Sequence, residues 1–479
     1  MGDVYCHICG VGFNIYRTRT DKEPRSAAWG EDGRAFAWGF APYDCPKEGC
    51  FYVRRDPYGD DSTAESEAGF SEPNIILFDD LQRGDRPEEW EHISGPECDQ
   101  NLAYNGHFIS AEAMRGCTTL QCLVRKSEDW KPEPDDEAFE ASGHFFLSGL
   151  SDHMPDKFDS GPTVFPERHS TGMLQAENWF RDPNDAERCS MPFHPTCLDI
   201  FKRASLHRYG VVDIECLTQW WALEAAYDYF LAFPRHQAVV DGRGDENIAW
   251  QHYEDCAFLA ANPCFVPGLQ ALLSSTKRSK KHGSNHSDLI PTAVSTETAP
   301  ADLFSRLPEE LRMTILMQLS YKDIANLRLA SRTFLQLPMS LFYQLAIRDM
   351  PWLYEAWSSL PISFWATTTQ SEIRELSDLS SASRPTTSPV MLSRTKTDWC
   401  RLKTLLSSNW KTLPGLQNRR RIWNDCQKIL DRVDRYRAQG KIRPGEAVDV
   451  AEVARQAKAR HDEQARRDRE RMRERMRGS

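Results

Sequence analysis

The clearest pattern of apolar and polar positions lies in the middle of the chain. Leu311, Ile315 and Leu319 recur every four residues and, with Leu316 beside them, form one apolar stripe along a helix. Pro308 is predicted at the first position of this helix, where its missing N–H is not needed and its fixed φ suits the turn. Two glutamates follow it, and the helix dipole favours negative charge in a first turn. The pattern therefore predicts an amphipathic helix.

A second helix is predicted directly after the first. Ser320 and Asp323 have the spacing of a capping box, which marks a helix start. This helix carries Ile324 and Leu327 inward, and Phe334 extends the apolar set into a short third helix. Fully burying one such side chain stabilises a fold by about 1.5–3 kcal/mol. Several left on a surface form a patch that normally marks an interaction site.

The remaining patterns divide the chain into five parts. An aromatic- and cysteine-rich N-terminal part is predicted to be globular, with its strongest helix candidate at residues 214–233. Polar, low-apolar stretches indicate linkers, and mixed charge without an apolar stripe indicates a solvated helix. The predicted fold class is mainly α with an α+β N-terminal domain. The parts are a globular domain at 1–272, a flexible linker at 273–298, a trihelical module at 299–348, a helical region at 349–450 with a disordered insert near 377–393, and a charged helical tail at 451–479.

Composition narrows the class of protein. The chain has 479 residues and a formal net charge of −11, which argues against wholesale nucleic-acid binding. No apolar run approaches the roughly 20 residues that cross a bilayer, and the first residues do not resemble a signal peptide. Its 14 cysteines are therefore expected to be reduced thiols or metal ligands, in the cytoplasm, the nucleus or both.

Motifs of common enzymes are missing from the sequence. We find no phosphate-binding glycine loop, no GxSxG elbow and no HExxH helix, so we expect a protein without catalytic activity. Two basic clusters remain. Residues 277–281 fit either a nuclear import signal or a solubilising linker, and residues 419–421 are predicted to lie on a solvated helical face.

Two short motifs far apart in the chain offer metal ligands. Cys6 and Cys9 form a CxxC followed by glycine, a spacing that turns two thiolates toward one ion. His194 and Cys197 are three residues apart, so one helical turn places both on one face. These four residues make a plausible tetrahedral zinc set; ordinary buried thiols and a core histidine are the alternative. His7 is expected to face solvent.

A further cysteine pairing is open. Cys45 and Cys50 flank a turn and could combine with Cys98 or Cys117. A complete set of four ligands would be structural, because it leaves no coordination position for a substrate or water.

The helical segment in mid-chain closely resembles the F-box. The resemblance implies a trihelical module that binds the Skp adaptor of a cullin–RING ubiquitin ligase, and it covers about a tenth of the chain. One departure is that Phe334 stands where many members carry a tryptophan nearby. The residues that carry the resemblance are Leu307, Pro308, Leu311, Ile315, Leu316, Leu319, Asp323, Leu327, Ser331 and Phe334. All of these except Asp323 and Ser331 are candidate adaptor contacts.

The N-terminal part is similar to the cysteine-bearing region found ahead of the F-box in many fungal proteins. Residues 6–10, 191–197 and 262–269 carry this likeness, which implies architecture and no reaction. The favoured function is a non-catalytic substrate receptor of an SCF-type ligase, holding the adaptor through the F-box and an unknown target protein elsewhere. The alternatives are a zinc-stabilised interaction or regulatory protein outside a ligase, and an enzyme with an unrecognised site.

Overall fold

The structure is a computed structural model of the chain, and it divides into two compact units. The first comprises Met1–Val266, Ile362–Thr386 and Pro414–Ser479, and the second Pro267–Pro361 and Thr387–Leu413. The residues that it describes are 4–29, 48–54, 75–76, 90–98, 103–133, 136–151, 163–168, 173–176, 190–224, 232–243, 250–251, 253, 255–277, 302–370, 372–373, 388–443, 455, 459, 463 and 466–467.

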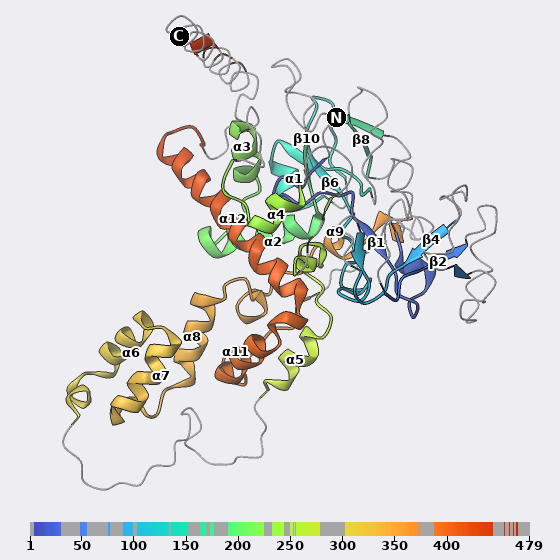
Figure 1. Cartoon of the computed structure of the whole chain (residues 1–479). Coiled ribbons are helices and arrows are strands. Elements are labelled where there is room, and N and C mark those ends of the chain that lie inside the picture. The colour runs from blue at the N-terminus through green and yellow to red at the C-terminus, as the bar shows by residue number, and fades with distance from the viewer. Residues whose placement is uncertain are drawn as a thin grey trace, which may run out of the picture. The chain divides into compact units, whose positions relative to one another are not determined.

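Within its described residues, the first unit contains four small sheets (Figure 1). In one, β6 (Gln121–Arg125) lies between β10 (Ser190–Phe193) and β7 (Phe145–Leu147), antiparallel to both. In another, β2 (Phe51–Arg54) lies between β3 (Ile75–Ile76) and β4 (Trp90–Ile93), again antiparallel. The remaining two are the parallel pair β1 (Tyr16–Thr18) with β5 (Ala103–Asn105) and the antiparallel pair β8 (Thr163–Pro166) with β9 (Met173–Ala176).

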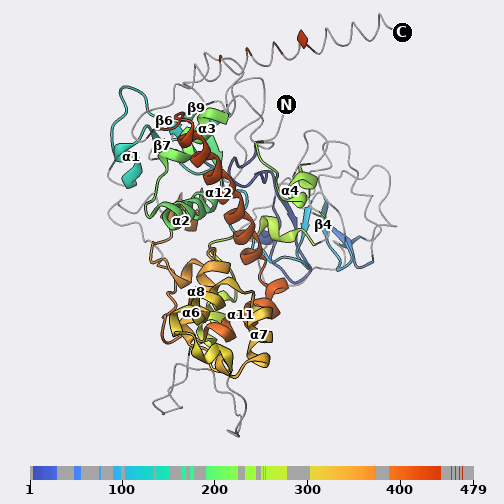
Figure 2. The ribbon, with the colours of Figure 1, turned by 90° about the vertical axis from the view of Figure 1, so that its left-hand side faces the viewer.

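Helices complete the first unit. α2 (Pro195–Tyr209) has proline at its first position and ends at Gly210, whose φ of 77° is the left-handed cap that glycine adopts freely. The long helix α12 (Pro414–Ala438) packs against α2 and α3 (Glu215–Glu224), as Figure 2 shows. Shorter helices are α1 (Ala138–Ser142), α4 (Gln237–Gly242) and α9 (Phe364–Thr367).

The packing of α12 follows from its apolar positions. Ile422, Cys426, Ile429 and Val433 recur every three or four residues, and each is at most 1% exposed. Residues 419–421, predicted to be solvated, depart from that expectation because Arg419 and Arg421 are buried. Their guanidinium groups donate hydrogen bonds to buried backbone and side-chain oxygens. These bonds take the place of the water that would solvate an exposed arginine.

The second unit is helical. The α-helices among its described residues are α5 (Leu269–Ser275), α6 (Glu309–Gln318), α7 (Tyr321–Ala330), α8 (Met339–Asp349) and α11 (Trp399–Ser408). α8 packs against both α6 and α11, and the rings of Tyr343 and Trp399 meet edge to face at 5.0 Å. The predicted fold class is confirmed: small sheets and helices are mixed in the N-terminal region, and the middle and C-terminal parts are helical.

Several predicted boundaries differ from the observed ones. α5 continues past residue 272, and residues 349–450 are split, because α12 packs in the first unit. Pro308 is the cap residue of α6, one position before the predicted one. α3 ends at Glu224; residues 225–231, most of the predicted insert and nearly all of the predicted tail lie outside the described residues.

Among the described residues, no helix is both long and apolar enough to cross a membrane.

Candidate metal centre and docking module

The CxxC motif forms a tight turn at the start of the first unit. The Cys6 N–H donates to the carbonyl of Val11 at 2.9 Å, and the Gly10 N–H donates to the carbonyl of Cys6 at 2.8 Å. Gly10 has a φ of 78°, a left-handed conformation that a side chain would strain. Two backbone N–H groups then reach sulfur: that of Cys9 lies 3.4 Å from Cys6 Sγ, and that of Val11 lies 3.5 Å from Cys9 Sγ. Such donors favour the thiolate form.

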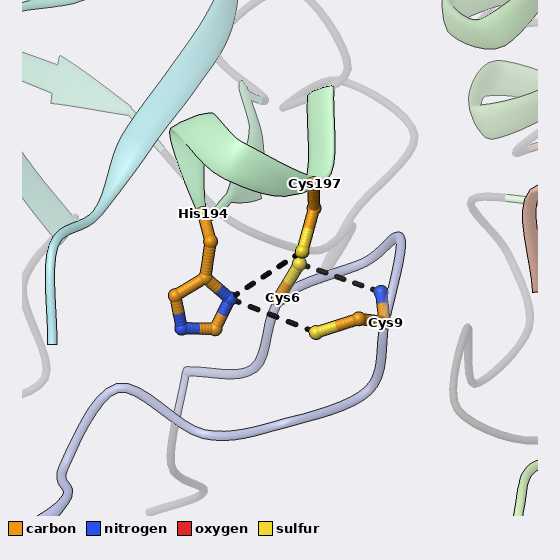
Figure 3. A group of neighbouring side chains, drawn as sticks. All are labelled: Cys6, Cys9, His194 and Cys197. Carbon is orange, nitrogen blue, oxygen red and sulfur yellow. Dashed lines mark hydrogen bonds between the residues drawn. The ribbon is translucent and has the colours of Figure 1, made fainter. Parts of the chain in front are cut away.

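His194 and Cys197 enter the same site from the first turn of α2 (Figure 3). His194 Nδ1 lies 3.6 Å from Cys9 Sγ and 3.9 Å from Cys197 Sγ. Its other ring nitrogen, Nε2, lies 2.9 Å from the carbonyl oxygen of Cys117, to which it donates. This hydrogen bond fixes the tautomer and turns the Nδ1 lone pair toward the three sulfurs, the arrangement common in metal-ligating histidines.

The four side chains form a ligand set that fits zinc. The ligand atoms of Cys6, Cys9, His194 and Cys197 all lie within 4.8 Å of one another, and each side chain is at most 6% exposed. Nitrogen and sulfur ligands at tetrahedral zinc lie about 3.5 Å apart, close to the two distances from His194 Nδ1. The structure thus brings together all four residues that the sequence singled out, although 185 positions separate Cys9 from His194.

Negative charge is concentrated in this cluster. Burial acts to raise the pKa of the Cys9 thiol, but hydrogen bonds from Cys197 and Cys6 outweigh it and hold that pKa well below its usual range. Burial raises the pKa of Cys197. For His194, burial acts to lower the pKa, and the charges of Cys6 and Cys9 raise it to about 10. The two cysteines thus favour positive charge at this position, as a metal cation would supply.

Two buried arginines hold the backbone of the CxxC turn. Arg421 Nη1 donates to the carbonyl of Cys9 at 2.7 Å, and Arg235 Nη1 donates to the carbonyl of Ile8 at 2.6 Å. Asp425 lies between them, with an oxygen 3.4 Å from Arg421 Nη1 and 3.8 Å from Arg235 Nη1. Zinc with three thiolates and a neutral histidine carries one net negative charge, so cationic side chains beside it are favourable.

His7 is buried, which corrects the expectation that it faces solvent. The indole N–H of Trp221 donates to His7 Nδ1 at 3.0 Å, and the two rings stack with centroids 6.5 Å apart. Burial, followed by the charge of Arg235, lowers the pKa of His7 to about 3. The ring is thus a neutral packing element, consistent with the prediction that it is not a ligand.

The trihelical module closes through a residue that the sequence analysis did not single out. Asp302 accepts hydrogen bonds from the backbone N–H of Phe304 at 3.0 Å and of Thr333 at 3.1 Å, and from the hydroxyl of Ser331. Phe304 packs edge to face on Phe334, with centroids 5.2 Å apart. The start of the module is therefore fastened to its third helix, the single 3-10 turn Arg332–Phe334. An Asp directly before a short helical turn, here Leu303–Arg306, is the signal that could have revealed this role.

The helices of the module begin where their polar residues predict. The Ser320 hydroxyl oxygen accepts from the Asp323 N–H at 3.2 Å and donates to the Asp323 carboxylate at 2.6 Å, which confirms the predicted cap of α7. Ile324 is buried beneath it, with 2% exposure. Replacing such a cap residue with alanine typically costs about 1 kcal/mol.

The predicted adaptor contacts divide by exposure. Leu316 is 2% and Phe334 1% exposed, so these two side chains fill the core of the module. Leu311 is 51% exposed and Pro308 is also exposed. Half-buried side chains complete the set, and these are Leu307, Ile315, Leu319 and Leu327. An apolar row therefore remains accessible on the module, beginning at the leucine–proline step.

Comparison with known protein families gives this module its identity. Residues 304–341 match the model of the F-box domain. The chain carries an F-box domain. The match covers Leu307 through Phe334, the residues that carry the resemblance, together with the start of α8.

Other comparisons cover little of the chain. The mitochondrial ATP-dependent RNA helicase mss116 of Aspergillus oryzae is 35% identical over 56 residues, which are 12% of this chain and 9% of the helicase. The chain thus spans less than a tenth of the length of that relative. No solved structure matches the chain.

Proposed function

We propose that this F-box protein is a non-catalytic substrate receptor of an SCF-type cullin–RING ubiquitin ligase. The F-box binds a Skp-type adaptor, and another part of the chain binds the target protein. The observation that carries the proposal is the F-box match at residues 304–341 together with the accessible apolar row on that module. A receptor of this kind works by raising the effective concentration of its target near the ubiquitin-conjugating enzyme, and it needs no chemistry of its own.

The adaptor surface that we propose begins at Leu307 and Pro308 and continues along α6 through Leu311 and Ile315. Leu311 supports this assignment because an exposed leucine gains free energy only when a partner covers it, by about 25 cal/mol for each Å² of apolar area removed from water. Leu316 and Phe334 act from within, by holding α6 against the rest of the module.

The first unit is our candidate for the target-binding part, because it is the larger unit. We infer that the Cys6, Cys9, His194 and Cys197 tetrad holds a structural zinc ion there. The four buried donors support this role, since a complete set leaves no position for a reactant. When bound, the ion would fasten the N-terminal turn to the first turn of α2.

Co-purification of a Skp-type adaptor with the full-length chain tests the proposal. We expect the wild-type chain to retain the adaptor and the double variant Leu307→Ala/Pro308→Ala to lose it. Val211→Ala is the matched control, because Val211 is 59% exposed and belongs to the first unit, outside the proposed surface. An adaptor that fails to bind the wild-type chain, while binding a known F-box protein under the same conditions, would contradict the proposal.

A second candidate function rests on the metal-ligand tetrad. The chain would then be a zinc-stabilised interaction or regulatory protein that acts outside a ubiquitin ligase. The buried tetrad favours this reading as much as the first, because it serves any protein that displays a rigid binding surface. Zinc in the purified chain without adaptor binding would select this second function.

A further inference from the structure

A second group of metal-ligand residues lies on the small sheet formed by β3, β2 and β4. Cys50 directly precedes β2, His92 is in β4, and Cys98 follows β4. The strand register pairs Tyr52 with His92. The start of β2, and with it Cys50, therefore lies beside β4. The ligand atoms of Cys50, His92 and Cys98 lie within 4.8 Å of one another, and the three residues are 7%, 4% and 2% exposed.

The backbone is built for close approach at this group. A Cβ added to Gly95 would lie 2.6 Å from the carbonyl oxygen of Glu48 and 2.9 Å from the nitrogen of Cys50, so only glycine fits between the two turns. The Gly95 N–H lies 3.3 Å from Cys50 Sγ and donates to it. Asn105 then fixes the second turn, because its Nδ2 donates to the carbonyls of Gly95 at 2.9 Å and of Cys98 at 3.1 Å.

His92 supplies an independent observation that points to a ligand. Its Nε2 atom is buried and has no hydrogen-bond partner among the described residues. An unsatisfied polar atom in a protein interior costs free energy, so it calls for an ion or another partner. The ring cannot turn away freely, since Tyr52, which is fully buried, stacks on it with centroids 5.3 Å apart.

We propose that Cys50, His92 and Cys98 bind a second zinc ion, separate from the tetrad at Cys6. Two thiolates and an imidazole are soft and borderline ligands, a set that selects zinc over magnesium or calcium. Three protein ligands leave the fourth tetrahedral position to a further donor. This site uses two of the cysteines whose pairing the sequence left open; Cys117 is not in the group, and Cys45 lies outside the described residues.

The position of the three ligands on short strands favours a structural role for this ion. The strands β2 and β4 have four residues each and β3 has two, and sheets this small gain little stability from their own pairing. An ion held at the start of β2, within β4 and at Cys98 in the following turn would fasten the sheet to β5, because Asn105 of β5 bonds to that turn. The proposal does not depend on the function of the F-box module.

The zinc content of the full-length chain tests the proposal first. The chain is purified in reduced form with zinc present, passed through a desalting column and measured by elemental analysis. We expect two zinc ions per wild-type chain. One ion per chain that is lost in a Cys197→Ser variant would overturn the proposal, because it would leave none for Cys50, His92 and Cys98.

Variants at His92 then assign the second ion. His92→Gln should retain one zinc, whereas His92→Cys should retain two, since a thiolate can replace the imidazole as a ligand. His144→Gln is the matched control, because His144 lies outside both groups and its side chain is 42% exposed. Two ions in His92→Gln would overturn the proposal. If this variant is insoluble, His92→Cys loaded with Co²⁺ decides, since a third thiolate must strengthen the sulfur-to-cobalt absorption; an unchanged spectrum overturns it.

A disulfide between Cys50 and Cys98 is the competing explanation for their proximity. Mass spectrometry of the unreduced, alkylated chain distinguishes this disulfide from a zinc site. We expect both thiols to be free once zinc is removed and protected from alkylation while it is bound. A disulfide-linked Cys50–Cys98 peptide from chain purified under reducing conditions would overturn the zinc site.

Discussion

Arg421 in α12 donates a 2.7 Å hydrogen bond to the backbone carbonyl of Cys9, although 412 positions of sequence separate the two residues. Both segments of the second unit lie between them in the sequence. The helix α12 is thus part of the structure around the N-terminal CxxC turn. The first unit can be complete only after the segment that follows the F-box has been made.

Replacement of Arg421 by alanine tests this dependence. The change leaves the Cys9 carbonyl without this donor and removes one of the two arginines beside the buried carboxylate of Asp425. Breaking a buried ion pair on one side typically costs about 3–5 kcal/mol. We expect the free energy of unfolding, measured with urea, to fall by about 3 kcal/mol.

The neighbouring Arg420 is the control for that change. Arg420→Ala removes the same charge and nearly the same volume from an exposed position of the same helix turn. Exposed substitutions usually change the free energy of unfolding by about 0.5 kcal/mol or less. Equal losses in the two variants would mean that Arg421 does not hold the turn.

Loss of one tetrad ligand should remove zinc and destabilise the first unit. Cys197→Ser replaces a sulfur ligand with a weak oxygen donor, while Cys256→Ser changes a half-buried cysteine outside both ligand groups. Structural zinc contributes about 10–16 kcal/mol to the folding of zinc-finger peptides. We therefore expect a large drop in melting temperature for Cys197→Ser and for chelated wild type, and little change for Cys256→Ser. A chelator without effect on wild type would contradict the structural role.

The F-box could be predicted from sequence because its signals are local. The spacing of Leu311 and Ile315 and the cap at Ser320 lie within one short segment, and each reports a helix directly. The four tetrad residues could also be predicted, because the CxxC at Cys6 and the HxxC at His194 each place two ligands on one side of a single turn. Only the fold could bring the two halves together.

Residues that act through distant contacts were missed or misread. His92 is a single histidine in a strand, so the sequence around it does not indicate Cys50 or Cys98 as partners. Arg419 and Arg421 stand in a basic run, and a basic run normally indicates solvated charge. Their burial depends in part on backbone oxygens of Pro263 and Cys9, which lie more than 150 positions away and are contained in no local pattern.

Asp302 should make the stability of the F-box module depend on pH. The hydroxyl of Ser331 and the N–H of Thr333 hold the pKa of the Asp302 carboxyl below its usual range. Its unfolded value is about 3.9, so the stabilisation is present above that pH and is lost as the pH falls below it. Asp302→Asn has no such charge. At pH 7 the free energy of unfolding, measured with urea, should therefore be larger for wild type than for Asp302→Asn.

The same comparison at low pH supplies the check. As the pH falls from about 4 toward the lowered folded-state pKa, wild type should approach the stability of Asp302→Asn. A difference that stays constant from pH 7 to pH 3 would show that the ionised carboxylate does not fasten the module. Asp398→Asn controls for the loss of a carboxylate cap elsewhere in the same unit, because the Asp398 side chain caps α11.

The affinity of the full-length chain for a Skp-type adaptor is the most direct test of the account. Leu311→Glu places a charge at a position that is 51% exposed, so the module itself should remain folded. Covering that charge with an apolar partner surface is unfavourable, and we expect the dissociation constant measured by calorimetry to rise at least about tenfold, or ~1.4 kcal/mol. Val211→Glu, at a position of the first unit that is 59% exposed, should bind as wild type does. Equal affinity of Leu311→Glu and wild type, or no adaptor binding by either, would contradict the proposed docking surface.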